Sequence, residues 1–335
     1  MNNEQKKVTF VLFGASGHLS KKYLLPALES LKINPIKISR KDYPNLKQII
    51  PRGGELVFHL AIPPEGVADA IKIIAENFAE ENSENIKILL EKPFGTDLKS
   101  AERLIEFIDK YFREEQIYRV DHYLAKKSLQ NLVGQNENIK AIEIIGSEKL
   151  DIEGRVNFYE KTGALRDSIQ SHMLEMVAVT LSGSFEREKR EEIIKNISII
   201  CDITKNECVK RGQYKGYREE VGNPGSMTET FVSVNLALGD VGITLTTGKA
   251  LREKLTQIKV IYKDGSEKIF NIVPEPDAYA KVLQATIAGN HHPFMSQKEV
   301  LESWRILEDI QETWKSGGSD LIIYERGTPI EELTS

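Results

Sequence analysis

The stretch VTFVLFGASGHLSKKYLLPALESL, residues 8–31, decides the fold class of the first part of the chain. A run of six residues without polar alternation leads into a turn that contains Gly14 and Gly17, and an amphipathic pattern follows. Such a run suits a strand covered on both faces, and the change to helical spacing predicts a strand–turn–helix unit. In these units the glycines let the backbone approach a pyrophosphate at the amino end of the helix. A tight turn that binds nothing is the alternative, because the full G-x-G-x-x-G pattern is absent.

The same alternation of strands and helices continues through the first 120 residues. The strand-like runs are VTFVLF, PIKIS, ELVFHLAI, IKILLE and QIYRV. This pattern predicts a doubly wound, Rossmann-like α/β domain. Farther on, helical patterns near 164–183, 276–289 and 296–315 bracket strands that short turns connect. We therefore predict a dinucleotide-binding domain over residues 1–125, and an α+β domain with a mainly antiparallel sheet over residues 126–335.

Composition limits the possible partners. The net charge of −5 argues against general binding to nucleic acid or to a membrane surface, which needs a basic excess. No apolar stretch approaches the length of a membrane span and the amino terminus has no signal-peptide pattern, so we expect a cytoplasmic protein. Cys201 and Cys208 match neither a redox motif nor a zinc site, and we expect reduced thiols. The histidines show no metal-binding spacing, and we expect no metal.

The residues around the glycine turn predict the cofactor. We expect it to contact the turn and the start of the helix, at Gly14, Ala15, Ser16, Gly17, His18 and Leu19. After the next strand, Arg40 and Lys41 would attract a 2′-phosphate, which favours NADP. Asp42 lies close enough to keep NAD possible, because an acid at this place binds the ribose 2′-hydroxyl. A solvated cluster of charges is the other interpretation.

Two further stretches carry polar groups at the ends of strands. Lys92 lies between a strand and Pro93, and the proline holds it extended at the edge where ligands bind. In IYRVDHYLAKKSLQNL, residues 117–132, His122, Tyr123 and Lys126 could hold a phosphate, since charge-assisted donors suit that anion. Asp121 would repel a phosphate, so it makes sense only if it faces another group. Solvated helix surface is the alternative for the whole stretch.

At this point the chain resembles a known family. The segments that carry the resemblance are GASGHLSKKYLLPAL, LLEKPFGTDLKSAERL, IYRVDHYLAKKSLQNL, TGALRDSIQSHMLEM, TTGKAL, PDAYAKVLQATIAGN and IIYERGTPIEEL. They look like the successive signatures of the glucose-6-phosphate dehydrogenase family, and they run in order through nearly the whole chain. The resemblance implies a Rossmann-like domain and an α+β domain whose sheet forms a homodimer. It also implies oxidation of the C1 hydroxyl of glucose 6-phosphate, with hydride passed to NADP or NAD.

The resemblance also implies roles for particular residues. His172 matches the family's catalytic histidine, Asp121 its acid partner, and Lys92 the lysine between cofactor and substrate. The implied substrate ligands are Lys92, His122, Tyr123, Lys126, Glu153, Asp167, His172, Lys249 and Lys254. A histidine is a suitable base because its pKa is near neutrality, and a carboxylate on its other nitrogen fixes the tautomer. Without the resemblance, His172 could equally be a satisfied core histidine, because apolar residues share its helix.

The chain also departs from the family. It is shorter than usual members, and a strand–helix unit and several sheet strands have no counterpart. Val273 stands roughly where the family has a glutamine that reaches the sugar, and His18 replaces an acid near the glycine turn. These departures leave two alternatives open. One is a dehydrogenase that acts on a different sugar phosphate, such as an amino or deoxy sugar, or at another carbon. The other is a catalytically silent regulator that binds sugar phosphates.

Overall fold

The structure is a computed structural model that describes residues 8–51, 53–79, 83–200, 203, 208–317 and 320–334. The chain forms two compact units. The first consists of Met1–Ala125 with Glu275–Val300, and the second of Lys126–Pro274 with Leu301–Ser335. The predicted division also falls after residue 125, but it leaves 275–300 in the second domain, whereas in the structure this segment belongs to the first unit.

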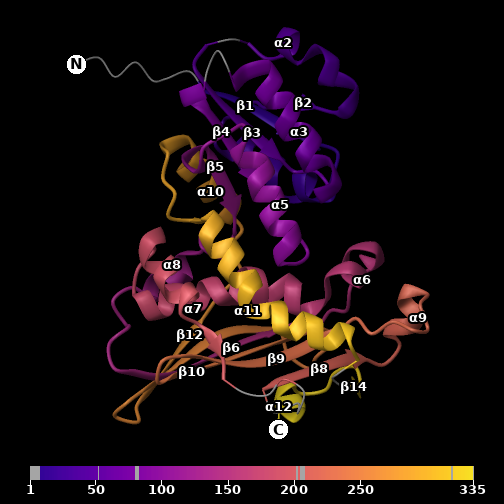
Figure 1. Cartoon of the computed structure of the whole chain (residues 1–335), viewed down its shortest axis with the longest axis vertical. Coiled ribbons are helices and arrows are strands. Elements are labelled where there is room, and N and C mark those ends of the chain that lie inside the picture. Colours follow the sequence, from indigo (N-terminus) through magenta and orange to yellow (C-terminus); the bar gives the residue numbers. More distant parts are fainter. Residues whose placement is uncertain are drawn as a thin grey trace. The chain divides into compact units, whose positions relative to one another are not determined.

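The first unit is built around a sheet of six strands, with the order β13-β5-β4-β3-β1-β2. Its elements, in which η marks 3-10 or π-helical segments, are β1 (Val8–Phe13), η1 (Ser20–Leu24), α1 (Leu25–Ser30), β2 (Ile36–Ile38), η2 (Arg40–Asn45), α2 (Leu46–Ile49), β3 (Glu55–Leu60), η3 (Pro64–Gly66), α3 (Val67–Ile74), η4 (Ala75–Ala79), η5 (Ser83–Asn85), β4 (Ile86–Leu90), α5 (Leu98–Asp109), η6 (Glu114–Gln116), β5 (Ile117–Val120), α10 (Ala278–Ala288) and β13 (Phe294–Met295). Strands β1 to β5 (Figure 1) pair with their neighbours in parallel, and β13 runs antiparallel to its neighbour β5. The predicted Rossmann-like α/β fold is confirmed.

The register of the parallel strands places their carboxyl ends at one edge of the sheet. Phe13, the last residue of β1, is the partner of Ile38 on β2 and of Leu60 on β3. The turn after each strand therefore begins at the same level. The apolar run of β1 is buried on both faces of the sheet, because helices cover it, as its sequence predicts.

The returning segment 275–300 completes the core of the first unit. Val282 and Leu283 of α10 and Phe294 of β13 are fully buried, and they belong to the same hydrophobic cluster as Leu28 of α1. Each large apolar side chain removed from water contributes about 1.5–3 kcal/mol. This cluster joins residues that are more than 250 positions apart in the chain.

The second unit is built around a larger sheet, with the strand order β12-β11-β6-β10-β9-β8-β14 and with β7 beside β9. Its elements are η7 (Lys127–Leu132), β6 (Ile139–Ser147), α6 (Val156–Ala164), η8 (Leu165–Met173), α7 (Leu174–Ser182), α8 (Arg187–Lys195), β7 (Ser198–Ile199), β8 (Val209–Tyr214), α9 (Tyr217–Val221), β9 (Phe231–Leu238), β10 (Val241–Gly248), β11 (Leu255–Tyr262), β12 (Glu267–Asn271), β14 (Leu321–Tyr324) and α12 (Ile330–Thr334). Helix α11 (Gln297–Lys315) begins in the first unit and continues in the second. The β6–β10 and β8–β14 pairs are parallel and the other pairs antiparallel, so the predicted mainly antiparallel sheet is confirmed.

The helix predicted over 164–183 starts at a sharp kink. Gly163 has a φ of 65°, and a Cβ atom there would lie 2.3 Å from Oε1 of Glu229. That oxygen accepts a hydrogen bond of 2.9 Å from the Leu165 backbone N–H. Only glycine fits at this place, and the buried Glu229 carboxylate caps the helix that follows.

The expectation of two reduced thiols is wrong for Cys208, because this residue is disulfide-bonded. Cys201, the other cysteine of the sequence, lies outside the described residues. Among the described residues, no helix has both the length and the apolar character needed to cross a membrane.

Candidate cofactor and substrate sites

The glycine turn lies tightly against the end of β3. Gly14 has a φ of 78°, and a Cβ atom added to it would come within 2.1 Å of the Ala61 carbonyl oxygen. The Gly14 carbonyl accepts hydrogen bonds from the Gly17 N–H, at 3.0 Å, and from the Ser20 hydroxyl, at 2.9 Å. No other residue fits at position 14, and these bonds tie the turn to the helix that it opens.

A cavity of about 720 Å³ opens beside this turn at the carboxyl edge of the first sheet. Its lining residues are Phe13, Gly14, Ala15, Ser16, Lys37, Ile38, Ser39, Arg40, Lys41, Asp42, Tyr43, Ile62, Pro63 and Gly66. Ligands of open α/β sheets bind at this edge, and the volume is in the range of cofactor sites. Of the predicted cofactor residues, Gly14, Ala15, Ser16, Arg40 and Lys41 line the cavity. Gly17, which closes the turn, and His18 and Leu19, which follow it, are not among the lining residues.

The charged residues of the cavity differ in their availability to a ligand. Arg40 and Lys41 are exposed, and the Arg40 guanidinium is 3.6 Å from the Cβ position of Gly66. Asp42 instead accepts hydrogen bonds from the Ser39 hydroxyl, at 2.6 Å, and from the Ser39 N–H, at 2.8 Å. These two bonds lower the pKa of Asp42. The acid that kept NAD possible is therefore engaged in capping its own helix, and the two cations remain at the cavity.

Sequence reasoning did not identify several residues of this cavity. Tyr43 packs against Phe13, with ring centroids 5.8 Å apart, and burial raises the pKa of the Tyr43 hydroxyl. The pattern Ser39-x-x-Asp42 resembles a capping box, and this spacing indicates that the Asp42 side chain caps the helix start. No pattern in the sequence indicates that Gly66 lines the cavity, because this residue lies far from the glycine turn in sequence.

The first unit also carries four of the predicted catalytic and substrate residues. Lys92 lies two residues after the end of β4, and Asp121, His122 and Tyr123 follow β5. Asp121 is 1% exposed, and its carboxylate accepts a hydrogen bond of 2.8 Å from the Tyr123 N–H. That bond folds the chain into a tight turn, so that His122 and Tyr123 leave the strand at a fixed angle.

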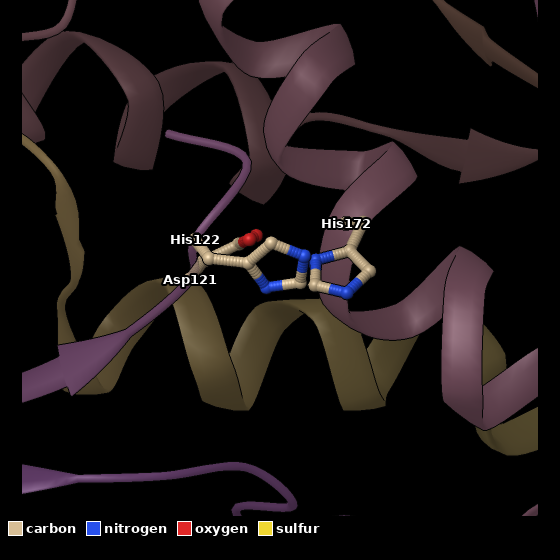
Figure 2. A group of neighbouring side chains, drawn as sticks. All are labelled: Asp121, His122 and His172. Carbon is tan, nitrogen blue, oxygen red and sulfur yellow. The ribbon is translucent and has the colours of Figure 1, made fainter. Parts of the chain in front are cut away.

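The second unit carries the remaining predicted residues. His172, on η8, is 7% exposed, and the preceding turn of the same segment carries Asp167, whose carbonyl accepts the Ser171 hydroxyl. Figure 2 shows His172 on its helix and, on the loop after β5, Asp121 and His122. Glu153 and Lys254 are exposed within this unit. The pairing of Asp121 with His172 stays a prediction, and so does the absence of a metal.

A buried tyrosine links two of the predicted substrate residues. Burial raises the pKa of Tyr159 well above its usual value, and the charge of Asp167 adds to the effect. The Lys249 ammonium lies 5.3 Å from the centre of the same ring. Lys249 is 4% exposed and forms an ion pair of 2.7 Å with Glu148. Lys249 thus lies at the ring of Tyr159, and Asp167, 82 positions earlier in the chain, acts on that tyrosine through its charge.

A parallel sheet with a glycine turn and a cationic cavity at its carboxyl edge defines a protein that binds a dinucleotide cofactor. Comparisons with known proteins give the family. A model described as "Glucose-6-phosphate dehydrogenase, NAD binding domain" matches residues 33–131, and one described as "Glucose-6-phosphate dehydrogenase, C-terminal domain" matches residues 127–275 and 271–331. This chain belongs to the glucose-6-phosphate dehydrogenase family.

Individual relatives agree with the family models. The chain is 30% identical over 329 residues to glucose-6-phosphate 1-dehydrogenase of Helicobacter pylori strain J99. The match covers 85% of this chain and 76% of the relative. The chain is 26% identical to the Bacillus subtilis strain 168 enzyme of the same name, with 97% and 95% covered.

Solved structures agree on the fold. A structure described as glucose-6-phosphate dehydrogenase in complex with its substrate glucose-6-phosphate has a TM-score of 0.82 at 21% identity, with 98% of this chain and 97% of that chain covered. The enzyme from Mycobacterium avium has a TM-score of 0.80 at 22% identity, with 96% and 94% covered. A putative myo-inositol dehydrogenase from Sinorhizobium meliloti 1021 has a TM-score of 0.63 at 12% identity, with 92% and 98% covered.

Proposed function

We propose that this protein is an NADP-dependent glucose-6-phosphate 1-dehydrogenase, an oxidoreductase that acts on a CH–OH group of a sugar phosphate. The observation that supports this most is the cavity at the glycine turn. It lies where the dinucleotide of such a fold binds, and two cations stand at it. The family membership supplies the sugar phosphate as the expected partner of that cofactor.

The proposed chemistry uses His172 as the base. Its ring nitrogen takes the proton of the C1 hydroxyl while C1 becomes a carbonyl carbon, and NADP, when bound, accepts the hydride that leaves C1. Asp121 binds the other ring nitrogen, which fixes the tautomer and stabilises the imidazolium that forms. The low exposure of both side chains supports these roles, because interactions between charged groups are stronger away from water.

The remaining predicted residues bind the sugar phosphate in this proposal. His122, Tyr123 and Lys126 hold the phosphate, and Lys92 lies between the sugar and the cofactor. Glu153 and Asp167 accept hydrogen bonds from sugar hydroxyls, while Lys249 and Lys254 supply positive charge. Glu148 keeps Lys249 paired when the substrate is absent, so that the buried ammonium has a partner before and after binding.

The preference for NADP follows from the charges at the cavity. A 2′-phosphate meets two exposed cations, Arg40 and Lys41. A 2′-hydroxyl would have to compete with Ser39 for the Asp42 carboxylate. We therefore expect this cavity to bind NAD less tightly than NADP.

We also propose that the protein is a cytoplasmic homodimer that assembles through the sheet of the second unit. Ile269 of β12 and Ile323 of β14, on the two edge strands, are each 54% exposed. Apolar side chains on edge strands are usually covered by a partner. Light scattering after size-exclusion chromatography measures the assembly, and a mass of 37.9 kDa, that of one chain, would contradict it.

The experiment that tests the function is formation of NADPH or NADH by the purified protein, followed by absorbance. Glucose 6-phosphate is compared with free glucose and with amino, deoxy and other hexose phosphates. We expect turnover of glucose 6-phosphate. Turnover of only another sugar phosphate would mean that the departures from the family changed the substrate. Binding without turnover would favour the silent regulator.

The role of His172 is tested with His172→Asn. We expect kcat to fall by roughly 10²–10⁴-fold, the usual contribution of a general base, with little change in the Kd for glucose 6-phosphate. His292→Asn serves as the control, because this exposed histidine belongs to a loop of the first unit. Unchanged turnover in His172→Asn would remove this residue from the mechanism.

A further inference from the structure

A completely buried histidine lies one strand away from Lys92. His59 of β3 is 0% exposed, and its Nε2 is 2.7 Å from Oε1 of Glu91, the residue directly before Lys92. The other ring nitrogen, Nδ1, has no hydrogen-bond partner among the described residues. A buried N–H without a partner is costly, so the proton belongs on Nε2, where it is donated to Glu91. His59 therefore donates one hydrogen bond, to the Glu91 carboxylate.

A second donor approaches the other oxygen of the same carboxylate. The Tyr279 hydroxyl, on α10, is 3.4 Å from Oε2 of Glu91, a long hydrogen bond. Burial, followed by the charge of Glu91, raises the pKa of Tyr279, so this hydroxyl keeps its proton and acts as a donor. The carboxylate is thus held from two sides, by β3 and by the returning segment 275–300.

The ring of Tyr279 makes two further contacts. It stacks with the His122 ring, with centroids 6.2 Å apart and planes at 11°, and with the Tyr23 ring, at 5.8 Å and 28°. Parallel aromatic rings restrict each other's rotation. Tyr279 therefore contacts both the residue before Lys92, through its hydroxyl, and His122, through its ring.

We propose that Glu91 and Tyr279 are positioning residues: the Glu91 carboxylate, held by His59 and the Tyr279 hydroxyl, fixes the chain at Lys92, and the Tyr279 ring orients His122. This inference rests on the proposed function, in which Lys92 lies beside the reacting carbon and His122 binds the phosphate. None of the three side chains needs to contact the substrate. Each acts through a neighbour that does, as buried partners of active groups commonly do.

This network has two arms. In the carboxylate arm, His59 and the Tyr279 hydroxyl hold Glu91, and in the ring arm, the Tyr279 ring contacts His122. The two arms predict different effects of mutation. Loss of the carboxylate arm in His59→Phe or Tyr279→Phe displaces Lys92 and lowers kcat, because misplacement by about 1 Å can cost about 100-fold. We expect a fall of about 10- to 100-fold for His59→Phe, with the KM for glucose 6-phosphate little changed. Tyr279→Leu removes the ring as well as the hydroxyl, so it should lower kcat as Tyr279→Phe does and should also raise that KM, by about 3- to 10-fold, the range of one aromatic contact.

Matched variants separate positioning from loss of packing. His59→Gln keeps an N–H donor at about the reach of Nε2 and should restore most of the kcat that His59→Phe loses. Phe58→Leu disturbs the neighbouring position of β3, which is buried on the opposite face of the sheet, and should lower Tm without lowering kcat. If kcat follows Tm across these variants, the network is only structural and the proposal is overturned.

Calorimetry with glucose 6-phosphate keeps this proposal distinct from the proposed function. If the wild-type protein shows no turnover, the proposed activity fails, but the ring arm still requires that Tyr279→Leu weaken glucose 6-phosphate binding while Tyr279→Phe does not. Equal Kd values for the two variants would overturn the positioning role of the ring. Failure of the wild-type protein to bind glucose 6-phosphate would overturn both proposals.

Discussion

At the scale of single residues, Arg40 is the side chain whose removal has the most specific consequence. The guanidinium is exposed, and Asp42, the one acid among the residues that line the cavity, accepts hydrogen bonds from both donors of Ser39. A charge-assisted hydrogen bond contributes about 1.5–3 kcal/mol, or roughly 10- to 100-fold in affinity. This contribution is available to a 2′-phosphate and is absent for NAD.

We therefore expect Arg40→Ala to raise the KM for NADP by about 10-fold or more and to leave the KM for NAD nearly unchanged. Steady-state kinetics with both cofactors measures the ratio. Lys47→Ala is the control, because it removes an exposed positive charge of α2 that does not line the cavity. An equal loss for both cofactors would contradict the assignment of Arg40 to the 2′-phosphate.

Several residues that line the cavity at the glycine turn could be predicted from the sequence, because they come shortly after strands. The glycine turn begins directly after β1, and Arg40 and Lys41 come two and three residues after β2. The ends of strands can be located in a sequence by their apolar runs. The His59–Glu91 pair could not be predicted. A buried histidine gives no pattern of its own, and its partner is 32 positions away on another strand.

At the scale of elements, the start of η8 shows what periodicity cannot predict. The apolar spacing over 164–183 indicates one helix, and a helix is present. The apolar pattern does not reveal the kink at Gly163 or the π-helical turns that follow. Over nine residues, the spacing of apolar positions is compatible with an α-helix and with a π-helix. The Glu229 carboxylate caps this segment by accepting a hydrogen bond from the Leu165 N–H. The two residues are 64 positions apart in the chain.

Glu229 should make stability depend on pH. Burial raises its pKa, and the Leu165 N–H opposes this only in part. A carboxyl with a raised pKa in the folded state binds its proton more tightly there than in the unfolded chain. Its contribution to stability is fully present below the ordinary carboxyl pKa, and it is lost as the pH rises through the raised value.

Glu229→Gln keeps the oxygen that accepts the Leu165 N–H but has no proton to lose. We expect its Tm to approach that of the wild type near pH 5 and to exceed it progressively more toward pH 8. Thermal unfolding at several pH values measures the difference. Glu331→Gln, an exposed carboxyl of the same unit, should show no such trend. A constant difference across this range would rule out titration of Glu229 as its cause.

At the scale of the whole molecule, the first unit is not one continuous piece of chain. The sequence predicts a boundary after residue 125, because the strand–helix alternation ends there, and the first unit has an end at the same residue. It gives no sign that residues 275–300 pack with the first unit, because periodicity reports which face of an element is buried and not which element covers it. The amphipathic pattern of α10 would have fitted a core in either unit.

A fragment of residues 1–125 should therefore fail to fold on its own. It lacks Val282, Leu283 and Phe294, whose burial is worth roughly 5–9 kcal/mol together, as much as the whole stability of many domains. We expect a fragment without a cooperative unfolding transition, measured by circular dichroism. A fragment that joins residues 8–125 to 275–300 through a flexible linker should regain the transition. Cooperative unfolding of 1–125 alone would contradict this dependence.

The returning segment also sets an order of events during synthesis. A ribosome releases the chain from its amino end, and domains generally fold as soon as they are complete. The glycine turn and Arg40 emerge early, but the core beneath them waits for α10 and β13, which are translated only after the whole sheet of β6 to β12. The nascent protein therefore carries an incomplete cofactor-binding unit while the sheet strands β6 to β12 are synthesised, and that unit is completed only after Met295 has been added.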